Sequence, residues 1–464
     1  MSNIGGGQGT ASAKSTAGMP TGAAPRIGWH RWVICAFLFF ATALNYVDRQ
    51  TLSVLQNTIA EFFKNDRSLD WVIQYSQIFY HSTFKANNGD WAIKYSFIIF
   101  CFQTAYAIGY VSFGALIDKL GAKLGYSIAV VIWTCAHIAC AMVTSLVGFS
   151  YMLFVLGLGQ SGNFPAALKA VAEWFPQRER ALANGVFNAG SNIGAIFTPL
   201  VVPIITLYFG WRMAFVATGS LSVIWLIFWV WLYRRPKDHP KLQPAELAYI
   251  ESDQPPKEKK LTWLQVMSKK ETWAFSIGKF LTDPIWWFYL FWLPGFLHEQ
   301  YKLDLSHFGP PVAVIYIISD LGSIAGGWMS STLIKRGQSV NAARKFTMLL
   351  CALCVMPVMF TMHIANLWLA VAVIGLATAA HQAFSANLYT LPSDLFPRAA
   401  VGSVSGIGGT AGAIGGMLMA IFIGFVRAVT GTYTIVFIVA GTIYLVALVF
   451  IHWLSPRLAP AKLI

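Results

Sequence analysis

The chain has 464 residues, of which 56% are hydrophobic, 15% aromatic and only 11% charged. So few charges cannot cover the surface of a water-soluble protein, in which about a quarter of the residues are charged, whereas a lipid-facing surface needs almost none. The net charge of +14 does not indicate nucleic-acid binding, because the Lys and Arg residues lie in the connections between apolar segments and form no single basic face.

The chain begins with a polar segment. Residues 1–25 are rich in Gly, Ser, Ala and Thr. They lack the short apolar stretch and small-residue cleavage site of a cleaved signal peptide. We therefore predict that residues 1–28 form a disordered cytoplasmic tail.

Apolar segments long enough to cross a membrane then follow one another to the end of the chain. A helix needs about 20 apolar residues to cross the bilayer core. The sequence therefore predicts an all-α polytopic membrane protein with twelve transmembrane helices. They are expected near 31–57, 94–117, 124–145, 148–173, 181–208, 212–233, 272–298, 308–333, 345–363, 366–392, 400–426 and 431–454.

A charged, proline-containing connection at 235–271 divides these segments into six and six. It separates an N-terminal bundle, residues 29–234, from a C-terminal bundle, residues 272–456, and residues 457–464 form a second tail. Most Lys and Arg residues lie on the side that the termini and this linker share. The positive-inside rule places that side, with both termini, in the cytoplasm.

The other long connection, about 58–93, lies on the opposite, periplasmic side. In it Trp71, Tyr75, Ile78 and Phe79 recur at helical spacing. This pattern predicts a short helix at the membrane interface. It would act as a lid or simply cover the rim of the bundle.

The two halves of the sequence resemble each other. Glu-Trp-Phe-Pro at 173–176 corresponds to Asp-Leu-Phe-Pro at 394–397, and the same offset aligns Gly185 with Gly406. Internal repeats of this kind are typical of transporters with two parallel bundles. Such a protein holds its substrate between the bundles and moves by rocking one against the other.

Residues 114–123 carry a recognisable motif. They read Gly-Ala-Leu-Ile-Asp-Lys-Leu-Gly-Ala-Lys, which resembles the signature G-x-x-x-D-[RK]-x-G-x-[RK] of the major facilitator superfamily. The resemblance implies the major facilitator fold and a cytoplasmic gate formed by Asp118, Lys119, Lys123 and Arg180. The corresponding stretch of the second half lacks the acidic residue.

Within that superfamily the chain resembles the anion:cation symporters, and most of all the bacterial hexuronate transporters, from about residue 29 to 456. The residues that carry this are Asn-Tyr-Val-Asp-Arg at 45–49, Gly-Asn-Phe-Pro-Ala at 162–166, Phe-Asn-Ala-Gly-Ser-Asn at 187–192, Lys-Phe-Leu-Thr-Asp-Pro-Ile-Trp-Trp at 279–287 and His-Gln-Ala-Phe-Ser at 381–385.

The resemblance implies a monomeric carrier in the bacterial inner membrane that imports a sugar acid, such as glucuronate or galacturonate, together with protons. Two features depart from the family pattern. The connection 58–93 is longer than usual, and Gln160 stands where the family usually has a glutamate, a candidate proton carrier.

Adjacent charged residues within the first span are the first candidates for function, because a charge inside the membrane costs a few kcal/mol. The guanidinium of Arg49 can bind a carboxylate with two parallel hydrogen bonds. We expect it to hold the substrate, and Asp48 to carry the proton once substrate binding has drawn Arg49 away. Alternatively, Arg49 and Asp48 only neutralise each other.

Lys279 is the second candidate ligand for the carboxylate, from the other bundle. Its alternative role is an i,i+4 ion pair with Asp283, one helical turn away. Asp320 either joins this network or has a structural role.

The hydroxyl groups of a sugar acid need amide, hydroxyl and aromatic partners. Asn188 and Asn192 share one face of their helix, and Trp286 and Trp287 offer flat rings, although each aromatic side chain could equally serve packing. The full set of further expected substrate ligands is Tyr46, Gln103, Tyr106, Asn188, Asn192, Trp286, Trp287, His381 and Gln382.

Other functions stay open at this stage. One alternative is a carrier of aldonates or other small organic acids, and another is a proton-driven exporter of amphipathic compounds. No nucleotide-binding motif, metal-ligand cluster or nucleophile-base pair is apparent in the sequence. We therefore expect neither an enzyme nor a cofactor, and the expected partners are an organic anion, protons and lipid.

Overall fold

The computed structural model describes all residues except 1–27, 81–88, 253–262, 460 and 462–464. The predicted N-terminal tail and parts of the 58–93 insert, the linker and the C-terminal tail thus lie outside the described residues. Within the described ranges, all regular secondary-structure elements are helices.

The first half contains α1 (His30–Val54), α2 (Gln56–Phe62), α3 (Asp70–Tyr80), α4 (Gly89–Ala139), η1 (Cys140–Met142), α5 (Leu146–Gln160), α6 (Asn163–Trp174), α7 (Gln177–Phe209) and α8 (Trp211–Leu232). The linker contains η2 (Pro236–Asp238), α9 (Pro244–Glu251) and α10 (Trp263–Met267). The second half contains α11 (Lys270–Tyr301), α12 (Gly309–Lys335), α13 (Val340–Val355), η3 (Met356–His363), α14 (Leu367–Leu388), α15 (Leu391–Leu395), α16 (Arg398–Thr430) and α17 (Thr434–Leu454).

Nine helices in the described ranges are long and apolar enough to cross a membrane. One of them contains α4, which folds back on itself at Gly121, where φ is 81°. A Cβ on Gly125 would lie 3.1 Å from the Cα of Ile117, although eight residues of straight helix span about 12 Å. α4 therefore crosses twice. With the broken span α5–α6 and with α11, the described residues make the twelve predicted crossings.

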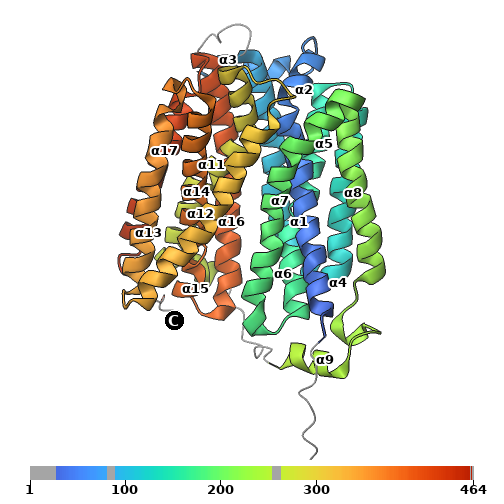
Figure 1. Cartoon of the computed structure of the whole chain (residues 1–464), viewed down its shortest axis with the longest axis vertical. Coiled ribbons are helices and arrows are strands. Elements are labelled where there is room, and N and C mark those ends of the chain that lie inside the picture. Colours follow the sequence, from blue (N-terminus) through green and yellow to red (C-terminus); the bar gives the residue numbers. More distant parts are fainter. Residues whose placement is uncertain (1–27, 81–88, 253–262, 460, 462–464) are drawn as a thin grey trace, which may run out of the picture.

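The helices form two bundles, α1–α8 and α11–α17, with the linker helix α9 at one end of the molecule and α3 at the other (Figure 1). We call these ends the α9 end and the α3 end. Equivalent helices pair in the same way in both halves: α1 packs on α7 as α11 packs on α16, and α4 packs on α5 as α12 packs on α14. This pairing agrees with the internal repeat.

The two bundles touch at the α3 end and separate toward the α9 end. Four glycines along α16 show how the separation between α16 and α4 changes from one end of the interface to the other. A Cβ built on them would lie 2.3 Å from the nearest α4 atom at Gly424, 3.2 Å at Gly416 and 3.4 Å at Gly409, and would meet nothing within 4 Å at Gly402. Gly114 of α4 also has open space around it. The interface is therefore closed at the α3 end only.

The predicted helix in the 58–93 insert is present as α3. Lys94 of α4 holds its start, with Nζ 2.8 Å from Oδ1 of Asp70 and 2.8 Å from the carbonyl oxygen of Asp66. Trp71 and Tyr75 are exposed on its outer face. The side chain of Phe79 lies outside the described residues.

Candidate functional site

Arg49 lies on α1 at the boundary between the bundles and is only 2% exposed. Its Nε donates a hydrogen bond to Oε1 of Gln160 over 3.1 Å, and Nη2 donates to Oδ1 of Asn45 over 3.0 Å. In the part of the chain that the structure describes, no carboxylate lies within ion-pair distance of this guanidinium. Arg49 is thus a buried cation held by neutral partners.

Aromatic rings surround the guanidinium. Its central carbon lies 4.8 Å from the ring centre of Tyr46, 5.0 Å from that of Tyr106 and 5.0 Å from that of Trp287. Phe102 lies slightly farther, at 5.6 Å. The negative faces of such rings attract a cation. Because Trp287 belongs to α11, this Arg49 cage is built by both bundles.

Gln160, the last residue of α5, completes the cage. Its Oε1 accepts from Arg49, and its Nε2 donates to the carbonyl oxygen of Asn45 over 3.1 Å. A glutamate here would form an ion pair with the guanidinium. The neutral amide instead keeps the geometry and leaves the positive charge of Arg49 available to an external anion. Asn45 was not predicted, although its position four residues before Arg49 places it on the same helix face.

Asp48 points away from the cage, into the N-terminal bundle. Its Oδ2 accepts from Ser222 over 3.1 Å, and its Oδ1 lies 3.3 Å from Nε2 of His137. The expected pairing of Asp48 with Arg49, whether as a coupling device or for neutralisation, is therefore wrong. Consecutive residues of a helix point about 100° apart, so the side chains of Asp48 and Arg49 point in different directions although the residues are neighbours in sequence.

Lys279 on α11 has partners within its own bundle. Its Nζ lies 2.6 Å from Oδ2 of Asp283 and 2.6 Å from the hydroxyl of Tyr389. The structure thus contains the i,i+4 pair that was the alternative interpretation of Lys279. Tyr389 was not predicted, because nothing in its local sequence distinguishes it. The positive charge of Lys279 is compensated, whereas that of Arg49 is not.

His381 on α14 stacks on Trp286 of α11, with ring centres 5.4 Å apart and planes 3° from parallel. Its Nδ1 lies 2.6 Å from the hydroxyl of Tyr444. These residues form a second aromatic group in the C-terminal bundle. Gln382 and Asp320 are half-buried.

The expected amide ligands lie at different places. Gln103 is fully buried, and neither of its amide atoms has a hydrogen-bond partner in the structure. Asn188 is exposed and Asn192 half-buried on α7. The Oδ1 of Asn192 accepts from Ser191, and no hydrogen bond joins either asparagine to Arg49 in the described part of the chain.

The charged residues of the expected gate contact their own bundle. Asp118 pairs with Lys169 of α6 over 3.2 Å. Lys119 is exposed and Lys123 half-buried. Arg180 donates to the carbonyl oxygens of Phe175 and Ala172 over 3.1 and 2.9 Å, at the C-terminal end of α6. These contacts agree with an interface that is open at the α9 end.

Residues 38–420 match the family described as Major Facilitator Superfamily. The chain belongs to the major facilitator superfamily. It is similar to the hexuronate transporter of Escherichia coli (strain K12), with 30% identity over 402 residues, which are 85% of this chain and 87% of that protein. It is also similar to the galacturonate transporter of Dickeya chrysanthemi, with 29% identity over 330 residues, 70% of this chain and 88% of that protein.

Solved structures of the superfamily share the fold. A bacterial homologue of the human lysosomal transporter Spinster, in an inward-facing and occupied conformation, has a TM-score of 0.68 at 16% identity, covering 93% of this chain and 98% of that chain. The predicted fold class is thereby confirmed. This member of the major facilitator superfamily is a multi-pass membrane transporter and not an enzyme.

Proposed function

We propose that this protein is a secondary active transporter that imports a hexuronate, such as glucuronate or galacturonate, with protons by alternating access. The observation that carries the proposal is the buried guanidinium of Arg49, which lies between the bundles and, among the described residues, has only neutral hydrogen-bond partners. A desolvated arginine without a carboxylate is suited to bind one from outside the protein. The names of the relatives support the same class of substrate.

The membrane placement follows from the charge distribution. Most Lys and Arg residues lie toward the α9 end, so the α9 end faces the cytoplasm of a bacterial inner membrane and both termini lie there. The present conformation, open at the α9 end, then faces inward. Asp118 and the basic residues near it belong to the gate that closes this end in the opposite conformation. We propose that the protein acts as a monomer.

The proton is assigned to Asp48. A glutamine cannot titrate, so Gln160 cannot take the role that the family usually gives to a glutamate. Asp48 lies buried beside His137 and Ser222, so its coupling to the Arg49 cage passes through movement of α1 and not through a direct contact. The substrate remains on the cage side of that helix.

The test is uptake of labelled glucuronate into proteoliposomes under an imposed proton gradient. The parent chain should concentrate glucuronate, and Arg49→Gln should abolish both uptake and equilibrium binding while folding normally. Arg427→Gln is a matched control, because Arg427 pairs with Glu299 outside the cage. Undiminished binding by Arg49→Gln would remove Arg49 from the site.

A related substrate class has support from another relative. The chain is 27% identical over 321 residues to the probable L-galactonate transporter of Escherichia coli (strain K12). Competition of galactonate with glucuronate in the same vesicles separates the two classes. Stronger inhibition by galactonate than by unlabelled glucuronate would make the aldonate the preferred substrate.

A further inference from the structure

Three glutamines of the N-terminal bundle are buried in the closed half of the interface without satisfying their amides. Gln50, Gln56 and Gln103 are 1%, 2% and 0% exposed. Both amide atoms of Gln50 and Gln103, and Oε1 of Gln56, have no hydrogen-bond partner in the structure. Burying an amide in this way costs free energy. An apolar side chain would seal this part of the interface better.

At their closest approach to the opposite bundle, Gln56 and Gln103 meet glycines, whereas Gln50 lies beside the hydroxyl group of Tyr316 on α12. The amide of Gln56 lies against Gly295 of α11, where a Cβ would be 2.5 Å from Oε1. Nε2 of Gln103 lies 3.2 Å from the Cβ position of Gly416 on α16. In this conformation, the amides of Gln56 and Gln103 therefore face glycine surfaces.

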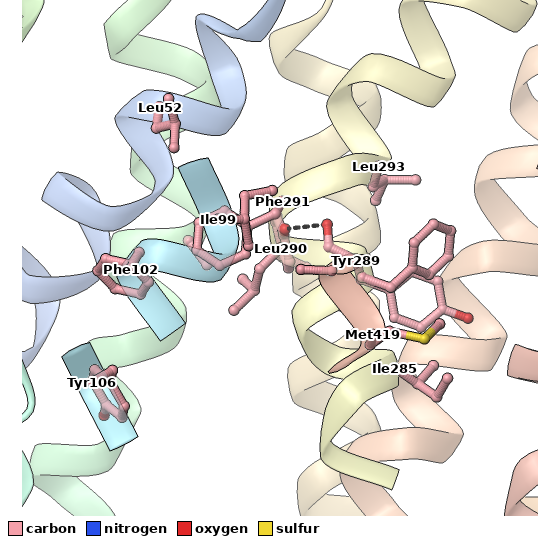
Figure 2. Packing of buried hydrophobic residues seen from close by; sticks show 14 of the residues in the cluster. Leu52, Ile99, Phe102, Tyr106, Ile285, Tyr289, Leu290, Phe291, Leu293 and Met419 are labelled. Atoms are coloured by element: carbon pink, nitrogen blue, oxygen red, sulfur yellow. Dashed lines mark hydrogen bonds between the residues drawn. The ribbon is translucent and has the colours of Figure 1, made fainter. Parts of the chain in front are cut away.

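The side chains around Gln103 are apolar. Ile99 of α4, Phe291 of α11 and Met419 of α16 line the same narrow space, and Ile99 lies beside Phe291 (Figure 2). The ring centres of Phe102 and Phe291 are 5.7 Å apart across the interface. The surface immediately around Gln103 is thus otherwise apolar.

The three glutamines form a path toward the Arg49 cage. Gly295, which Gln56 touches, is eight residues beyond Trp287 on α11, a distance of about 12 Å along the helix. Gln103 lies beside Trp287, the ring that covers Arg49. Gln50 is one residue beyond Arg49 on α1, and its side chain faces Tyr316 of α12 across the interface. Gln56 therefore lies between the α3 end of the molecule and the cage, whereas Gln50 and Gln103 lie at the level of the cage.

We infer that Gln50, Gln56 and Gln103 form one wall of an entrance that opens at the α3 end in the opposite conformation, and that their amides bind the hydroxyl groups of a polyhydroxylated acid on its way to Arg49. An amide offers two donors and an acceptor, which suits a chain of hydroxyl groups. The inference rests on the proposed function and adds a site outside the Arg49 cage. The buried, unsatisfied amides cost free energy only in the conformation in which the entrance is closed.

The first test compares the two faces of the transporter. Gln56→Met and Gln50→Met keep the side-chain volume and remove the amide. We expect the KM for glucuronate to rise roughly two- to tenfold for uptake from the α3 side, which corresponds to the loss of one hydrogen bond. The KM from the α9 side should not rise. Met419→Leu, an apolar change on the same surface, is the matched control.

A competitive inhibitor without hydroxyl groups distinguishes the loss of hydroxyl binding from a change in the equilibrium between the two conformations. Cyclohexanecarboxylate has the carboxylate and no hydroxyl groups. Its inhibition constant from the α3 side should stay unchanged in Gln56→Met and Gln50→Met while the KM for glucuronate rises. An equal change for both compounds, or equal changes on both faces of the membrane, would overturn the inference.

A second measurement needs no transported substrate. Gln56→Cys, treated from the α3 side with a membrane-impermeant thiol reagent, should be labelled beyond the parent chain, whose six native cysteines give the background. Labelling at a position that is buried here requires the opposite conformation. Labelling of Gln56→Cys equal to the background would contradict the inference that an entrance opens at the α3 end. Failure of the parent chain to take up glucuronate would reject only the proposed substrate.

Discussion

At the scale of single residues, the neutral amide of Gln160 sets the charge of the Arg49 cage. Arg49 binds Gln160 and Asn45 through hydrogen bonds of 3.1 and 3.0 Å, so its position is fixed before a substrate arrives. The aromatic rings keep water from the guanidinium, and electrostatic interactions are stronger where water is excluded. A carboxylate introduced at position 160 would compete with the substrate for this charge.

The first prediction follows for Gln160→Glu. Ionised Glu should pair with Arg49 and weaken glucuronate binding roughly ten- to a hundredfold, since a charge-assisted hydrogen bond contributes about 1.5–3 kcal/mol. Protonation at lower pH removes the competing charge, so binding should strengthen as the pH falls. Equilibrium binding across a pH series measures this, with Gln160→Asn as the neutral control. Identical pH profiles for the Glu and Asn variants would contradict the prediction.

At the scale of elements, one glycine turns a continuous apolar segment into two crossings. Gly121 has φ of 81° and ψ of 168°, a conformation that is essentially restricted to glycine and costs other residues about 1–3 kcal/mol. A Cβ there would also lie 2.9 Å from Nη2 of Arg235. The hairpin in α4 places the Arg49 contacts of Phe102 and Tyr106 on one limb and His137, the partner of Asp48, on the other.

The second prediction concerns this hairpin. Gly121→Ala should lower the free energy of unfolding by about 1–3 kcal/mol, measured as a lower melting temperature of the purified protein. Gly114→Ala is the matched control, because nothing lies within 4 Å of a Cβ at that position. Equal melting temperatures of the two variants would show that the turn tolerates a side chain.

At the scale of the whole molecule, transport requires the interface to close at the α9 end and open at the α3 end. The closed end shows what closure needs: at Gly424 a Cβ would lie only 2.3 Å from Oγ of Ser96. Gly114 and Gly402 have open space now, and we expect α4 and α16 to approach each other at these residues in the opposite conformation. Glycine at both positions allows the same close approach.

The third prediction follows from that asymmetry. Gly114→Leu should leave the melting temperature of the present conformation nearly unchanged and slow exchange across the membrane roughly tenfold or more, since overpacking costs about 1–3 kcal/mol. Exchange of labelled for unlabelled glucuronate measures the rate. Gly114→Ala, which adds a single methyl group, should slow exchange less than Gly114→Leu does. Full exchange by the Leu variant would mean that α4 and α16 do not meet at this level.

The sequence by itself determined the twelve crossings, the helix in the insert and Arg49 as an unusual intramembrane cation, because apolar length and charge are local properties. Asn45 was within reach of the same reasoning, since helical spacing alone places it beside Arg49. The sequence also placed Gly121 and Gly114 in one motif. It did not reveal that Gly121 turns the chain, whereas Gly114 has open space around it.

Only the tertiary structure decided which neighbours each polar side chain has. It directed Asp48 to His137 and Ser222 and gave Lys279 the hydroxyl of Tyr389. It also placed three glutamines at the interface with amide atoms that have no hydrogen-bond partner in the described part of the chain. The physical reason is that a helix fixes the direction of a side chain relative to its own axis, whereas its contacts depend on the rotation and distance of helices remote in sequence.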